Sequence, residues 1–152
     1  MPEALEKIIK EKISADHLLY VSMKYTKTCD VMINLLERWK IMMDYAFDAL
    51  LDKAKKNKMI KKLPNAPKLR IDAIAEIFAD EPDVMNALKE YRMFKLIMIL
   101  SKTKEGEFRK GVCLRVTYQG KEIAVNLDKL KEYSEILERF INYTKLFLSS
   151  KK

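Results

Sequence analysis

The stretch from Ser14 to Lys56 constrains the fold more than any other part of the chain, because it contains no glycine and no proline. Apolar side chains recur along it at intervals of seven residues, and a second set keeps this interval with an offset of four. The first set is Leu18, Tyr25, Met32, Trp39 and Ala46, and the second is Cys29, Leu36, Met43 and Leu50. This repeat predicts one long helix with a wide apolar face, the central element of a helical bundle.

The composition favours helices throughout. The chain has 152 residues, of which 49% are hydrophobic and 34% charged, with only three glycines and four prolines. This is enough apolar material for one core and suits long helices better than a β-fold. We therefore expect residues 1–152 to form a single all-α domain, a helical bundle of four or five helices.

The central helix is longer than the expected body of the domain. With Ser14 as its N-cap, it would extend for about 63 Å at 1.5 Å per residue. A compact domain of this size is only about 40 Å across. Either the helix bends near Tyr25–Thr28, or one end overhangs and is covered by a partner. We expect an overhang with slight curvature, and therefore a homodimer that covers it.

The remaining apolar periodicity predicts shorter helices over residues 3–13, 68–79, 82–102 and 128–148. A period of two near residues 110–127 predicts a single β-hairpin. Its turn is either the two residues Gln119–Gly120 or a longer loop, since Gln is a poor first residue of a type I′ turn. The register that gives this hairpin one apolar face pairs Val116 with Ile123, Leu114 with Val125 and Val112 with Leu127.

The formal net charge is +8, with 30 Lys and Arg against 22 Asp and Glu, and residues 53–70 contain no acidic side chain. Such a run can bind the phosphates of a nucleic acid. It can equally be a solvated surface whose lysines neutralise the end of a helix dipole. The candidate nucleic-acid-binding residues are Lys53, Lys55, Lys56, Lys58, Lys61 and Lys62, with Arg109 and Arg115 near the hairpin and Phe108 and Tyr118 as stacking groups.

Few side chains suit catalysis or metal binding. His17 is the single histidine, which excludes most dyads and histidine-rich metal sites. Asp44 and Asp48, with Glu37, share one helix face that either holds a cation or is a solvated polar surface. Cys29 and Cys113 are expected to be buried free thiols. We therefore expect no catalytic site, no cofactor and no metal.

The opening residues, Met1–Ala4, lack the basic and apolar segments of a secretory signal, and no uncharged run approaches about 20 apolar residues. The sequence therefore predicts a cytoplasmic protein without a membrane segment. Glutamine occurs only at Gln119 while Lys and Glu abound, a bias typical of thermophile proteins.

The order of elements resembles the HEPN superfamily of helical-bundle proteins and uncharacterised archaeal helical proteins. The resemblance rests on the long first helix, the segment Pro64-Asn65-Ala66-Pro67-Lys68-Leu69-Arg70, and Glu107-Phe108-Arg109-Lys110 before a late helix. It implies a dimeric α-bundle. Active HEPN members are ribonucleases with an Arg followed four to six residues later by His, whereas here His17 precedes the first arginine, Arg38.

Together these features predict a non-catalytic helical interaction or scaffold module that forms a homodimer and binds another protein. The alternative is a nucleic-acid-binding protein that uses residues 53–70.

Overall fold

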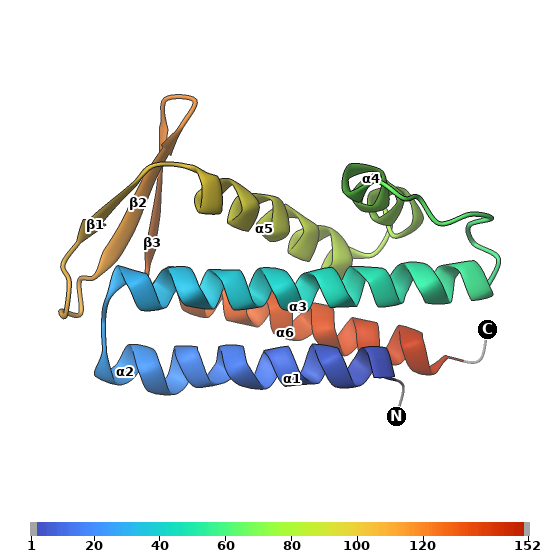
Figure 1. Ribbon diagram of the computed structural model, residues 1–152, viewed down its shortest axis with the longest axis horizontal. Coiled ribbons are helices and arrows are strands. Elements are labelled where there is room, and N and C mark those ends of the chain that lie inside the picture. Colours follow the sequence, from blue (N-terminus) through green and yellow to red (C-terminus); the bar gives the residue numbers. More distant parts are fainter. Residues whose placement is uncertain (1–2, 151–152) are drawn as a thin grey trace.

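The computed structural model describes residues 3–150 and is mostly helical, as predicted (Figure 1). Helix α3 runs through the middle of the molecule, beside α1 on one side and α5 on the other, and α6 also packs on it (Figure 1). The elements in chain order are α1 (Glu3–His17), the π-helix η1 (Leu18–Ser22), α2 (Met23–Tyr25), α3 (Cys29–Lys56), α4 (Pro67–Ile77), α5 (Pro82–Ile99), β1 (Lys102–Glu105), β2 (Cys113–Tyr118), β3 (Lys121–Asn126) and α6 (Leu127–Ser149).

The expected continuous helix from Ser14 to Lys56 is wrong. Helices α1, η1 and α2 follow one another without a break and form a helical arm, Glu3–Tyr25, after which the chain reverses and α3 runs antiparallel beside the arm (Figure 1). Ser14 is not an N-cap, because it lies inside α1. The helix boundary is therefore at residues 26–28, the bend that we considered and did not favour.

The reversal at residues 26–28 is stabilised by capping. Thr28 is extended (φ −120°, ψ 155°), and its side chain accepts a hydrogen bond of 3.3 Å from the backbone N–H of Val31. Asp30 places a carboxylate in the first turn of α3, where the helix dipole favours negative charge. A threonine N-cap contributes about 1 kcal/mol, comparable to the helix propensity lost at two threonines.

Folding back also buries the apolar side of the helical arm within one chain. Ile8, Ala15, Leu19 and Met23 are buried in the same core cluster as the apolar side of α3. Consequently α3 is only 28 residues long, about 42 Å at 1.5 Å per residue. The overhang that was our reason to expect a homodimer is absent, so a dimer needs a different argument.

Aromatic packing joins α3 to α5 and α6. Trp39 is 3% exposed, and its ring stacks on Phe94 with centroids 5.9 Å apart. Tyr133 meets both rings edge-on, at 6.3 Å from Trp39 and 5.0 Å from Phe94. The sequence placed Trp39 in the apolar seam, and its burial agrees with that position.

The β-structure is a three-stranded antiparallel sheet in the order β1-β2-β3, not a single hairpin. The hairpin of β2 and β3 has the predicted pairs Leu114 with Val125 and Val116 with Ile123. The predicted pair of Val112 with Leu127 is wrong, because Leu127 already begins α6. The turn has two residues, Gln119 (φ 51°) and Gly120 (φ 77°), the shorter of the two alternatives.

Strand β1 replaces the end of a predicted helix. Helix α5 ends at Ile99, and Lys102 pairs with Val116 where we expected a last helical residue. The sequence of β1, Lys-Thr-Lys-Glu, has no apolar alternation to indicate a strand. Charged residues of this kind are typical of exposed edge strands, which they protect from pairing with other chains.

Candidate functional site

The six lysines predicted to bind nucleic acid lie together at one end of the molecule, which we call the lysine end. Lys53, Lys55 and Lys56 lie in the last turn of α3, and the loop that follows contributes Lys58, Lys61 and Lys62. Five are exposed, whereas Lys53 is half-buried and donates a 2.6 Å hydrogen bond to the carbonyl of Ser150. Within residues 3–150, none of the six forms an ion pair with a carboxylate.

Lys58 has an unusual backbone conformation for a lysine. It follows the C-cap residue Asn57 with φ 62°, in the left-handed region. The N–H of Met59 bonds to the carbonyl of Ala54 at 2.8 Å, and that of Lys58 to Lys55 at 3.0 Å, which is a Schellman motif. This motif prefers glycine at the position of Lys58, because a side chain there costs about 1 kcal/mol or more.

Arg109 and Arg115 do not join the lysine end. They lie in or next to the sheet, which stands beside the amino end of α3, whereas the lysines follow its carboxyl end (Figure 1). Arg115 hydrogen-bonds to Glu105 and Glu122, and these bonds raise the pKa of its guanidinium. Arg109 is exposed. The eight predicted residues are therefore divided between two surfaces separated by about the 42 Å length of α3.

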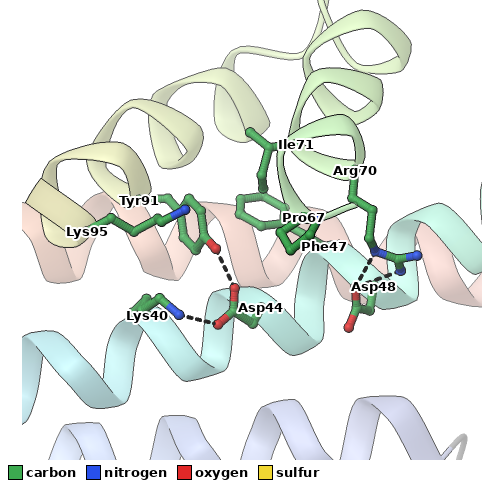
Figure 2. Close-up of a pocket in the computed structure, with 9 residues that line it drawn as sticks. All are labelled: Lys40, Asp44, Phe47, Asp48, Pro67, Arg70, Ile71, Tyr91 and Lys95. Atoms are coloured by element: carbon green, nitrogen blue, oxygen red, sulfur yellow. Dashed lines mark hydrogen bonds and ion pairs between the residues drawn. The ribbon is translucent and has the colours of Figure 1, made fainter. Parts of the chain in front are cut away.

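A pocket of about 340 Å³ lies between α3, α4 and α5 (Figure 2). Phe47, Pro67 and Ile71 provide apolar lining, and the other lining side chains are Tyr91 and five charged residues. Asp44 accepts hydrogen bonds from Tyr91 Oη at 2.5 Å and from Lys40 Nζ at 2.9 Å, as Figure 2 shows. The polar groups at this pocket therefore connect helices, with Asp44 joining α5 to α3.

A second ion pair joins α4 to α3 at the other side of the same pocket. Arg70 contacts the carboxylate of Asp48 at 2.7 and 3.2 Å (Figure 2) and also donates to the carbonyl of Pro64 at 3.1 Å. Glu37 and Asp48 are exposed, which agrees with a solvated polar face, and Asp48 in addition joins α3 to α4 through Arg70. Within residues 3–150 we find no group of three His, Cys, Asp or Glu side chains that could hold a metal ion.

The pKa values of Tyr91 and Cys29 are both raised, which favours their protonated forms. Burial and the hydrogen bond to Asp44 raise the pKa of Tyr91, so its phenol acts as a donor at neutral pH. Cys29 and Cys113 are buried free thiols, as predicted, and Cys29 Sγ lies 3.3 Å from the carbonyl of Cys113. Burial, followed by the hydrogen bond to Glu107, raises the pKa of Cys29 to about 11.

The helical arm carries an exposed row of side chains, which we call the arm face and which the sequence pattern did not predict. Ile13 is 64% exposed and Tyr25 is 77% exposed, although both are large and apolar. The sequence assigned Tyr25 to the buried seam because residues 18–22 were expected to be α-helical. The π-helix η1 has more residues per turn than an α-helix, so it rotates the residues after it about the helix axis. As a result, residues four positions apart across η1 remain on the same face of the arm. The arm face consists of Glu6, Lys10, Ile13, His17, Val21 and Tyr25, all exposed.

Comparison of the chain with family models, with curated proteins and with solved structures finds no match. The HEPN-like assignment therefore stays a prediction. Across the described part of the chain, no helix is both long enough and apolar enough to cross a membrane.

Proposed function

We propose that this protein is a non-catalytic interaction module that forms a homodimer through the arm face. The observation that carries this proposal is the exposure of Ile13, Val21 and Tyr25 in one row along a helix whose opposite side is buried against α3. Burying one such side chain contributes about 1.5 to 3 kcal/mol relative to leaving it in water. The outer edge of the arm has no other element beyond it in Figure 1.

A second copy can cover this row, because an antiparallel partner places a side chain opposite each of its exposed apolar residues. When two arms pair antiparallel about an axis near Ala15, Ile13 faces His17, Lys10 faces Val21 and Glu6 faces Tyr25. Lys24 Nζ lies 5.8 Å from the centroid of the Tyr25 ring, so each Glu6 also meets a positive charge. A two-fold axis repeats every such contact twice, which is how isologous interfaces gain stability.

Sedimentation velocity at tens of micromolar tests the proposal. The wild type is expected to be a dimer and the Ile13→Lys variant a monomer. In a dimer of the variant, the new lysine and Lys10 of both copies would place four positive charges close to the two-fold axis. Leu146→Lys is the matched control, since Leu146 is an exposed leucine on α6 and its substitution should leave the dimer intact. A monomeric wild type, or equal effects of the two substitutions, contradicts the proposal.

A charge exchange tests the register. Glu6→Lys should weaken the dimer because it faces Lys24, and adding Lys24→Glu should restore it. Each exposed ion pair contributes about 0.2 to 1 kcal/mol and occurs twice. The single variant should therefore raise the dissociation constant by about 2- to 30-fold, and failure of the double variant to recover argues against antiparallel pairing.

A second candidate function is nucleic-acid binding at the lysine end, and Lys58 is the observation that favours it. A lysine in a position that suits glycine breaks a local rule, and such exceptions cluster at functional sites. Five exposed lysines without carboxylate partners in residues 3–150 are available to phosphates. If about four phosphates are neutralised, the logarithm of the binding constant should fall against the logarithm of the salt concentration with a slope of about −3.6 for duplex DNA or about −2.8 for a single strand.

Lys58→Gly separates the two explanations of the lysine end. Glycine should stabilise the fold by about 1 kcal/mol, because it relieves the left-handed strain. If Lys58 binds phosphate, the affinity for nucleic acid at low salt should fall while stability rises. Gln119→Gly is the matched control, because Gln119 also has positive φ (51°) and no charge is lost. Equal affinities of wild type and Lys58→Gly would leave the lysine end as a solvated surface.

A further inference from the structure

The loop between β1 and β2 presents Phe108 to solvent in a strained conformation. Its side chain is 75% exposed and its φ is 67°, a region that bulky side chains rarely adopt. An exposed phenylalanine gains nothing from burial, and the left-handed backbone is unfavourable for a residue with a Cβ. Strain of this kind at an exposed aromatic is typical of a binding residue held in position.

Two hydrogen bonds hold this loop against the start of α3. The N–H of Phe108 donates to the carbonyl of Lys27 at 2.6 Å. The carboxylate of the preceding residue, Glu107, accepts from the N–H of Cys29 at 3.2 Å. Gly106 lies so close to the carbonyl of Gly111 that a Cβ would approach it to 2.7 Å. The loop is therefore closed at its base and fixed at its tip, so the backbone at Phe108 is held in place before any ligand arrives.

A basic groove begins next to this loop. It has a volume of about 480 Å³, and its lining includes Lys27, whose carbonyl accepts from Phe108, and Lys110, two residues after Phe108. Arg115 and Lys131 add two more positive charges, and the single acidic residue of its lining is Asp128. Arg115 is already bound to Glu105 and Glu122. Lys27, Lys110 and Lys131 form no ion pair within residues 3–150.

We propose that Phe108 and this groove bind single-stranded nucleic acid, with one unpaired base stacked on the Phe108 ring and the adjoining phosphates in contact with Lys27, Lys110 and Lys131. An aromatic face beside a positively charged groove is the arrangement by which proteins hold single strands without reading their sequence. A duplex has no unpaired base to offer at an exposed ring. The ligand class is the same as at the lysine end, but no residue is shared, so either site can fail alone.

Replacement of the ring tests the stacking. Loss of one stacked base weakens binding by about 5- to 150-fold, so Phe108→Ala should bind a fluorescent oligouridine that much less tightly. Binding of inorganic polyphosphate, which has the charges but no bases, should be unchanged. Ile99→Ala is the control, because Ile99 is an 80% exposed apolar side chain just before β1 and should have no effect.

Phe108→Trp supplies a direct signal. The native Trp39 is buried, so a tryptophan at position 108 adds a separate, solvent-exposed emission, which oligouridine should quench and polyphosphate should not. Unchanged oligouridine affinity in Phe108→Ala, an equal loss of polyphosphate binding, or an unquenched tryptophan would each overturn the proposal. A triple variant is the separate test of the lysine end, with Gln in place of Lys55, Lys58 and Lys61. This variant should lose affinity for oligouridine and polyphosphate alike.

Discussion

The carboxylate of Glu107 accepts hydrogen bonds from the backbone N–H of Cys29 at 3.2 and 3.3 Å. These residues are 78 positions apart in sequence. Cys29 is the first residue of α3, so Glu107 places a negative charge at the positive end of that helix. One contact thus closes the turn between the helical arm and α3 and also fixes the loop that carries Phe108.

Glu107→Gln should lower the free energy of unfolding by about 1 kcal/mol, because an amide oxygen can accept the hydrogen bond but carries no charge for the helix dipole. Urea unfolding measures this change. Glu135→Gln is the control, since Glu135 is exposed on α6 and forms no ion pair within residues 3–150. Equal stabilities of the two variants would show that Glu107 does not cap α3.

The raised pKa of Cys29 predicts a loss of stability at alkaline pH. In the folded protein the pKa of this thiol is about 11, whereas the ordinary pKa of a cysteine is 9.0. As the pH rises, the unfolded chain therefore loses the thiol proton before the folded protein does. The stability that Cys29 contributes is complete below about pH 9 and declines as the pH rises through 11. Burial also raises the pKa values of Tyr91 and Tyr133, which adds to the decline at higher pH.

Comparison of Cys29→Ala with the wild type isolates the thiol. Urea unfolding at several pH values between 8 and 11 should show a shallower decline in the variant, because the tyrosines titrate in both proteins. Parallel curves for the two proteins would mean that Cys29 titrates normally.

Trp39→Ala should cost about 3 to 5 kcal/mol, because it leaves a cavity between Phe94 and Tyr133 in the centre of the bundle. Chemical unfolding followed by circular dichroism measures the loss. Leu69→Ala, at an exposed position of α4, should change stability by less than about 0.5 kcal/mol. A loss below about 1 kcal/mol at Trp39 would mean that this ring is not part of the core.

The sequence predicted those elements whose signal is local. Helix α6, the β2–β3 register and the turn at Gln119 each follow from spacing or turn residues within a short window. The chain reversal was missed because the interval of seven from Tyr25 to Met32 continues across it. The contact that helps to close the reversal comes from Glu107, far along the chain, and no local pattern carries it.

The sequence predicted the charge of the candidate sites but not their backbone conformation. The lysine run is visible in the sequence, but the positive φ of Lys58 and of Phe108 depends on how each loop closes. Likewise, the exposure of Tyr25 depends on the π turn at residues 18–22, which shifts the face of the helix by part of a turn. Hydropathy alone assigned Tyr25 to the interior.

Cross-linking of two engineered cysteines tests the central claim, antiparallel pairing through the arm face, most directly. Glu6→Cys and Tyr25→Cys variants are each purified, mixed and oxidised mildly, with the wild type as control because Cys29 and Cys113 are buried. Position 6 of one copy should meet position 25 of the other, while identical positions lie about 28 Å apart along the helices. The proposed dimer therefore predicts a disulfide-linked dimer in the mixture and little in either variant alone. A cross-link within the Glu6→Cys variant alone, or none in the mixture, would contradict it.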